Sequence, residues 1–407
     1  MTNKRYIFLI IILGSLTALS PFSIDMYLPA FQDIAKSLNT TTARVDLSLS
    51  SFFIGLAFGQ LLYGPLMDRY GRKRPLYFGL SLYIIASIAC FLSGSVEMLI
   101  AVRLVQAIGS CAAGVASVAM VRDLFPVKDS AKVFALLVLV LGASPLVAPT
   151  AGGYLAVAFG WQSVFIVLLC LAVLILVAVI FTLPESYKPD VNYSLKPGPI
   201  ISSFRLVLRN PQFYTYALSG SLAFCGLFAY VAGSPLVFMD VFGLTKTQYG
   251  WMFAGLSIGF IGSSQINSLL IKRFKSEHII KVALTAQTIV SIVFLTGAIN
   301  GWFNLAGTIT MIFMMLCCVG LINPNAVALS MSPFPKNAGV ASALWGTMQL
   351  GLGAASSFFI GIFSSRSATP LAAVMAASAT AGFIILLIGR AKIVQSVEAD
   401  VTAPAGH

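Results

Sequence analysis

Apolar segments of about 20 residues recur along the whole chain, and each could cross a roughly 30 Å bilayer core as a helix. Of the 407 residues, 58% are hydrophobic and only 9% are charged. Soluble domains carry about 25% charged residues, so this chain is suited to lipid rather than water. Transmembrane β-strands need only about ten alternating residues. The segment lengths therefore predict an all-α membrane protein.

Twelve membrane-spanning helices are predicted, six on each side of a polar stretch at 184–209. The first six are Tyr6–Phe31, Asp46–Leu66, Pro75–Gly94, Met98–Val121, Ala131–Val157 and Trp161–Leu183. The last six are Gln212–Met239, Thr247–Ile271, Ile279–Ile299, Trp302–Met331, Ala338–Ser364 and Pro370–Gly389. We expect two six-helix bundles, 1–183 and 212–390, with a cytoplasmic linker at 184–211 and a cytoplasmic tail at 391–407.

The basic residues predict the orientation, because loops on the cytoplasmic side are rich in Lys and Arg. One face holds most of these cations, including Arg69, Arg72, Lys73, Arg74, Arg122 and the linker. The other face holds only Lys36, Arg44, Lys246 and Arg366. Both termini are therefore predicted to be cytoplasmic. The net charge of +12 is explained in the same way, and no nucleic-acid partner is expected.

Motifs for other functional classes are missing from the sequence. It contains neither a phosphate-binding G-x-x-x-x-G-K-[ST] loop nor a zinc-binding H-E-x-x-H motif. The only histidines are His278 and His407, and the six cysteines lie in apolar spans without C-x-x-C spacing, as small core residues would. We expect no enzyme activity, no cofactor and no metal site.

Asp25 is the acidic residue that lies inside an apolar run rather than at its edge. An Asp at the centre of a bilayer costs roughly 2.5–3.5 kcal/mol, so an ionisable group there usually faces a polar interior and has a function. Arg103 lies inside the fourth span at a similar predicted depth. Because each charge alone would be costly, we expect the two side chains to form an ion pair.

The turn after the second span reads G-P-L-M-D-R-Y-G-R-K-R, residues 64–74. Taken alone, it is a charged turn on the cytoplasmic face. It strongly resembles motif A of the major facilitator superfamily, whose loop latches one transport conformation. That resemblance assigns a conformational role to residues that match the motif, namely Gly64, Asp68, Arg69, Gly71, Arg72 and Lys73.

Two further motifs support the resemblance. R-L-V-Q-A-I-G at 103–109 is similar to motif B, whose arginine the family associates with proton coupling. S-P-L-V-A-P-T-A-G-G at 144–153 is similar to the antiporter motif C, with Ser144 and Ala148 in place of two glycines. The motif C candidates are Pro145, Pro149, Gly152 and Gly153. The alternative for this stretch is a kinked helix that needs small residues at its contacts.

D-M-Y-L-P at 25–29, with G-W-Q-S-V-F at 160–165 and S-P-L-V-F at 234–238, resembles the Bcr/CflA branch of drug–proton antiporters. The resemblance implies a monomeric exporter in the bacterial inner membrane. It would exchange protons for drug-like molecules such as chloramphenicol or bicyclomycin, with Asp25 and Arg103 as the proton-coupling residues. The alternatives are an exporter of an endogenous metabolite (an amino acid, sugar or siderophore), a channel or a receptor. A purely structural Asp25–Arg103 pair also remains open.

Related exporters carry a second acid two helical turns before the D-M motif, where this chain has Thr17. We therefore expect a single membrane-embedded carboxylate. Residues that could contact substrate are Asp25, Tyr230, Asn323, Asn325 and Gln349. Hydrogen bonding between helices is the alternative role for the polar residues of this set. The shortage of negative charge favours neutral or amphiphilic substrates.

Overall fold

Long helices make up most of the computed structural model, which describes residues 3–189, 197–334, 338–362 and 367–402. The helices in the first part of the chain are α1 (Asn3–Asp25), α2 (Phe31–Ser37), α3 (Thr42–Tyr70), α4 (Lys73–Phe91), α5 (Val96–Leu124), α6 (Val127–Phe159) and α7 (Gln162–Thr182). Those in the second part are α8 (Pro197–Leu208), α9 (Pro211–Ser234), α10 (Lys246–Leu270), α11 (Ser276–Ile299), α12 (Leu305–Met331), α13 (Ala338–Ile362) and α14 (Thr369–Thr402).

Local signals place several helix starts. The side chains of Thr41, Ser95, Asn210, Thr245 and Asn304 each accept a hydrogen bond from a backbone N–H in the first turn that follows them. Such caps satisfy N–H groups that have no partner inside the helix. The helices therefore begin where the sequence supplies a short polar side chain before an apolar run.

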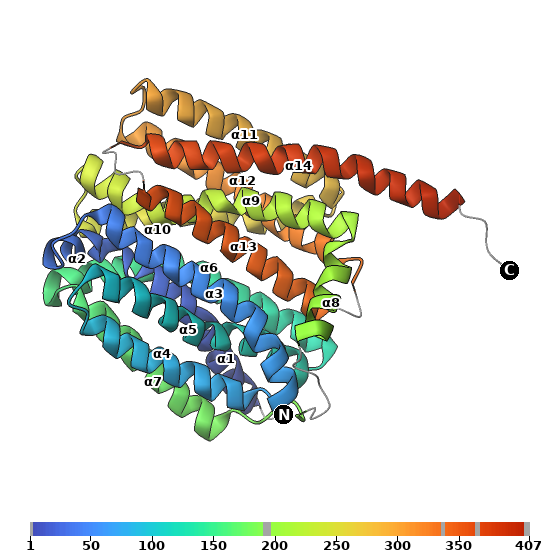
Figure 1. Ribbon diagram of the computed structural model, residues 1–407, viewed down its shortest axis with the longest axis horizontal. Helices are drawn as coiled ribbons and strands as arrows, with labels where there is room; N and C mark the ends of the chain where they lie inside the picture. Colours follow the sequence, from blue (N-terminus) through green and yellow to red (C-terminus); the bar gives the residue numbers. More distant parts are fainter. Residues whose placement is uncertain (1–2, 190–196, 335–337, 363–366, 403–407) are drawn as a thin grey trace.

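Two groups of helices lie side by side in Figure 1. Helices α1 and α3–α7 pack mainly on one another, and so do helices α9–α14. The main contacts between the groups join α3 to α13 and α6 to α10. We call these groups the first half and the second half. The interface between them positions the residues discussed below.

The two ends of the molecule differ in charge. The basic end carries Arg69, Arg72, Lys73, Arg74 and Arg122, close to the loops after α3 and α5. The opposite end carries Asp33, Arg44, Glu97 and Lys246. Helix α8 lies at the basic end and α2 at the opposite end (Figure 1).

Ten of the described helices are long and apolar enough to cross a membrane. Two further long helices, α10 and α13, are not among those ten. Both contain many Ser, Thr, Gln and Gly residues, and both pack against the other half. Helices at such an interface are less exposed to lipid, so they can be less apolar.

The structure adds detail to the predicted linker and tail and corrects the expectation for one cysteine. Within the tail predicted at 391–407, α14 continues to Thr402. Cys170 of α7 is exposed rather than part of the core, whereas Cys90, Cys111 and Cys225 are buried. The predicted linker contains α8, although its residues 190–196 lie outside the described part of the chain.

Candidate functional site

Asp25 is the last residue of α1, so the span predicted to continue to Phe31 is interrupted there. Pro29, four residues later, has no N–H to donate to the Asp25 carbonyl, and a proline ring clashes with that carbonyl in a continuous helix. The chain instead turns through a short 3₁₀ segment, Leu28–Ala30, into α2. The interruption places the Asp25 carboxylate at a helix C-terminus, where negative charge is unfavourable.

The Asp25 side chain borders a cavity of about 200 Å³ that we call the inner cavity. Its walls come from both halves and are almost entirely apolar, including Pro145, Phe53, Phe228, Tyr230, Phe253 and Phe260. Asp25 is only 6% exposed, and within the described residues its carboxylate makes no hydrogen bond or ion pair. An ionised carboxylate in such surroundings is strongly disfavoured, so the geometry suits a group that gains and loses a proton.

Tyr230 lies in the wall of the inner cavity. Its ring stacks on Phe253 with a centroid distance of 5.0 Å, and its buried hydroxyl has no hydrogen-bond partner. Asp25 of α1 and Tyr230 of α9 border the same cavity. Leaving a buried hydroxyl unpaired costs about 1–3 kcal/mol, so this residue of the cavity wall carries an unmet hydrogen-bonding group.

Arg103 does not form the predicted ion pair with Asp25. It is fully buried, and its two Nη atoms donate to the Ser23 carbonyl at 2.9 Å and the Gln106 side chain at 2.7 Å. Tyr27 and Phe52 flank its guanidinium, with centroids 4.7 and 4.1 Å away. The physical reason is the interruption of α1, whose last carbonyls lack helical partners and attract a cation. Arg103 therefore holds the helix end that carries Asp25.

A second buried carboxylate corrects the expectation that Asp25 is alone. Asp46 lies one turn inside α3, is 3% exposed, and neither of its carboxylate oxygens has a hydrogen-bond partner. The predicted span began at Asp46 and so placed this residue at the edge. Thr41 was the sequence signal that the helix begins earlier: it caps α3 one turn before Asp46 and so places Asp46 inside the helix. Thr17, where related exporters carry an acid, shares a hydrogen bond of 2.7 Å with Ser117.

The motif C residues of α6 lie where this helix touches both α1 and α10. A Cβ on Gly152 would lie 2.0 Å from the Met26 carbonyl oxygen, and one on Gly153 would lie 2.9 Å from the Lys246 carbonyl oxygen. Pro145 and Pro149 lie within α6, and Pro145 also borders the inner cavity. The glycines thus permit backbone contacts that any larger residue would prevent, as the small-residue interpretation predicted.

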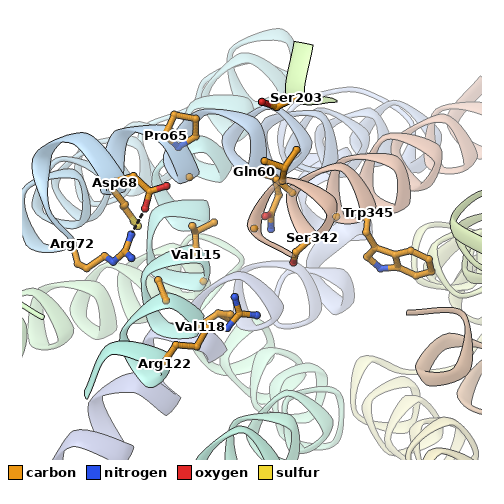
Figure 2. Close-up of a pocket in the computed structure, with 18 of the residues that line it drawn as sticks. Gln60, Pro65, Asp68, Arg72, Val115, Val118, Arg122, Ser203, Ser342 and Trp345 are labelled. Atoms are coloured by element: carbon orange, nitrogen blue, oxygen red, sulfur yellow. Dashed lines mark hydrogen bonds and ion pairs between the residues drawn. The ribbon is translucent and has the colours of Figure 1, made fainter. Parts of the chain in front are cut away.

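The motif A residues form a charged network at the basic end. Arg72 donates to Asp68 at 2.8 Å, drawn as a dashed line in Figure 2, and to Asp123 at 2.9 Å. Burial lowers the pKa of the Arg72 guanidinium, but its hydrogen bonds to Asp123 and Asp68 outweigh burial, so the net pKa is raised. Gly71 has a φ of +83°, a left-handed conformation that favours glycine.

Glu185, which the sequence interpretation missed, completes this network. Its carboxylate accepts hydrogen bonds from the backbone N–H groups of Arg72 at 2.8 Å and Lys73 at 3.1 Å. A Cβ on Gly71 would lie 3.0 Å from the same carboxylate. Asp68 pairs with arginine, whereas Glu185 accepts from the N-terminus of α4, where negative charge is favourable. The Arg69 guanidinium lies over the Tyr70 ring, and Gly64 has open space around it.

Replacing Glu185 with glutamine is expected to lower the thermal stability of the purified protein. The amide keeps the shape but removes the negative charge from the N-terminus of α4, a loss of about 0.3–1 kcal/mol. Asp240→Asn is the control, because Asp240 lies near the end of the helical segment Pro235–Val241, where negative charge is not favoured, and the amide oxygen can still accept from Gln32. Equal unfolding temperatures for the two variants would contradict the role assigned to Glu185.

A larger cavity of about 690 Å³ lies at the basic end, between α3 and α5 of the first half, α13 of the second half and α8 (Figure 2). It is more polar than the inner cavity, with Gln60, Asp68, Arg72, Arg122 and Ser342 in its walls. At the opposite end, polar contacts close the space between the halves: Lys246 pairs with Asp33, and Gln32 donates to Asp240. The space between the halves is thus widest at the basic end.

The remaining substrate candidates are engaged by other side chains. Gln349 donates to Asn323 at 2.9 Å, and Asn325 donates to Asn267 at 2.6 Å. Neither pair borders the two cavities described above. Hydrogen bonding between helices therefore accounts for these amides. Across the described residues, no group of three or more His, Cys, Asp and Glu side chains could hold a metal ion.

Comparison with known proteins identifies the family. The model of the Major Facilitator Superfamily matches residues 13–357, so the chain is a member of this superfamily of membrane transporters and not of an enzyme family. It is 32% identical to an uncharacterized MFS-type transporter, YdgK of Bacillus subtilis, over 94% of this chain and 95% of that one. It is also 31% identical to a bicyclomycin resistance protein homolog of Haemophilus influenzae, over 93% and 95%.

A third relative is the multidrug resistance protein MdtL of a Shewanella strain, 28% identical over 91% of this chain and 93% of that one. These relatives support the Bcr/CflA-like branch of drug–proton antiporters that the motifs indicated. Among solved structures, a D-xylose–proton symporter aligns with a TM-score of 0.71 over 94% of this chain and 97% of that one. At 16% identity, this likeness shows the fold alone.

Proposed function

We propose that the protein exports small drug-like molecules in exchange for protons, by alternating access between its two halves. The bundles predicted at 1–183 and 212–390, joined by 184–211 and followed by 391–407, would be the moving bodies. The proposal includes twelve spans in a bacterial inner membrane, and the distribution of Lys and Arg supports a cytoplasmic location for the basic end. The family, its drug-resistance relatives and the interface between the halves support this proposal.

The observation that carries the proposal is the unpartnered Asp25 carboxyl in the wall of the inner cavity. In this almost entirely apolar cavity the neutral acid is favoured, because burying an unpaired charge is costly. When the halves separate at one end, water reaches the carboxyl and stabilises its charged form by hydration. Asp25 can therefore bind a proton from one side of the membrane and release it on the other.

Arg103 is a positioning residue in this mechanism. It bonds the Ser23 carbonyl, two residues before Asp25, and fixes the end of α1 without neutralising the carboxylate. A direct ion pair would hold Asp25 in its charged form and oppose protonation. The bond from Arg103 to the backbone leaves Asp25 free to titrate while keeping its position.

The inner cavity indicates the substrate class. Its walls carry several phenylalanine rings from both halves, together with the side chains of Tyr230 and Asp25. Such a surface suits neutral or amphiphilic molecules with an apolar body and few polar groups. Hydrophilic metabolites such as sugars or free amino acids would lose more hydration than this cavity can replace.

Expression in a bacterial strain that lacks its own exporters tests the proposed function. We expect the protein to raise resistance to chloramphenicol- or bicyclomycin-type compounds and to lower their accumulation in cells. An uncoupler that collapses the proton gradient should restore accumulation. Resistance without any uncoupler sensitivity, or a change in metabolite release alone, would contradict proton-coupled drug export.

A further inference from the structure

Asp46 is a buried carboxyl that plays no part in the mechanism described above. It is the fifth residue of α3, one turn beyond Thr41, and lies past the first-turn N–H groups that are free to bind an anion. Its two carboxylate oxygens are shielded from solvent and have no hydrogen-bond partner. A position so close to the helix start would normally be solvated, so its burial must come from tertiary contacts.

Those contacts come from the other half of the molecule. A Cβ on Gly361 of α13 would lie 3.4 Å from Asp46 Oδ2 and 3.1 Å from the Ala43 carbonyl oxygen, so the two helix backbones approach closely here. One turn further along α3, the Ser50 hydroxyl donates to Ser357 of α13 at 2.7 Å. The Asp46 carboxyl is therefore enclosed by the α3–α13 interface near the opposite end.

No charge on the neighbouring elements compensates Asp46 within the described residues. The described part of α13, Ala338–Ile362, contains no ionisable side chain. The Tyr27 hydroxyl shares its hydrogen bond with Ser48 and not with Asp46. On the other elements that pack against α3, most charged groups have their own partners: Arg44 with Glu97, Arg103 with Ser23 and Gln106, Lys246 with Asp33, and Asp240 with Gln32. Lys36 of α2 is exposed to solvent.

We propose that Asp46 is a second proton-binding site, which controls closure of the opposite end. The neutral acid fits the dry α3–α13 interface, whereas the carboxylate requires water and therefore separated halves. A proton bound at Asp46 closes the opposite end, and release of that proton accompanies its opening. This inference rests on the proposed alternation between the halves, but it does not require proton exchange at Asp25.

Distance measurements between spin labels at Ser37→Cys and Asn300→Cys test the inference. Both positions are exposed at the opposite end, one in each half, and the native cysteines would be replaced. We expect acidification to shift the protein toward the short distance. A single proton changes the ratio of closed to open molecules by at most about tenfold per pH unit.

Asp46→Asn is expected to remain closed at all pH values, because the amide imitates the neutral acid. Asp46→Leu, which also removes the charge, should behave in the same way and serves if the amide variant does not fold. Asp25→Asn is the companion control and should retain the pH-dependent shift. An unchanged pH dependence in either Asp46 variant, or no pH dependence in the parent protein, would overturn the inference.

These outcomes separate the two proton sites. If Asp25→Asn abolishes proton-driven export but leaves the shift in distance unchanged, both assignments stand. Loss of the shift only in Asp25→Asn would assign closure to Asp25 and overturn the role of Asp46. A wild-type response in both Asp46 variants would do the same without affecting the proposed export function.

Discussion

Asp25→Asn is expected to lower proton-driven export by at least about tenfold, which corresponds to about 1.4 kcal/mol. Asparagine has nearly the shape of the protonated carboxyl, so the inner cavity should keep its form and continue to bind substrate. It cannot release a proton, however, so the gradient no longer drives transport. Export from vesicles with an imposed pH gradient measures the loss.

Glu97→Gln is the matched control for Asp25→Asn, because it removes a carboxylate charge from an exposed ion pair outside both cavities. Its export should equal that of the parent protein at equal expression. Exchange of labelled for unlabelled substrate, which needs no net proton movement, should survive in Asp25→Asn. Full gradient-driven export by Asp25→Asn would remove Asp25 from the proposed proton pathway.

Gly152→Ala is expected to reduce both the amount of folded protein and its transport activity. The new Cβ would lie 2.0 Å from the Met26 carbonyl oxygen, a backbone atom next to Asp25. Either α6 or the end of α1 must move, and overpacking of this kind costs about 1–3 kcal/mol. Thermal unfolding of the purified protein and export per folded molecule measure the two effects.

Gly142→Ala provides the control within the same helix. A Cβ there would lie 3.4–3.6 Å from the Ile261 side chain, which is close to ordinary van der Waals contact with a flexible group. Both variants gain the same helix propensity, up to about 1 kcal/mol. The difference between them therefore isolates the contact with Met26. If both are equally stable and active, the close approach of α6 to α1 has no functional importance.

Much of the fold could be predicted from the sequence, because lipid requires each span to be a long apolar helix. The twelve predicted segments correspond to long helices, although only ten of the described helices are apolar enough to be recognised as spans on hydropathy. The exceptions are α10 and α13, which pack against the opposite half. The glycine-rich charged turn at 64–74 likewise led to the correct family.

The contacts of the charged residues could not be predicted from depth alone. The predicted depths of Asp25 and Arg103 in the membrane were similar. The interruption of α1, however, gave Arg103 the Ser23 carbonyl to bind instead of Asp25. Pro29 was the available signal, since it removes the N–H that would have satisfied the Asp25 carbonyl. Asp46 was overlooked because its burial depends on α13, some 300 residues further along the chain.

Glu185 shows the same limit for the charged network at the basic end. Arg72 and Asp68 are four residues apart, so their contact follows from helical geometry. Glu185 joins them from 113 residues away, through a segment that the sequence marked only as a linker. Local patterns predict local pairs, whereas partners brought in by tertiary packing need the structure.

Proton release on substrate binding tests the central claim most directly. Adding a chloramphenicol-type substrate to purified protein in weakly buffered solution should acidify the medium, because a hydroxyl or amide of the substrate donates a hydrogen bond to the Asp25 carboxylate and so replaces the bound proton. The account predicts release of about one proton per bound substrate in the parent protein and none in Asp25→Asn, with substrate binding retained. Equal proton release by the parent protein and Asp25→Asn would contradict it.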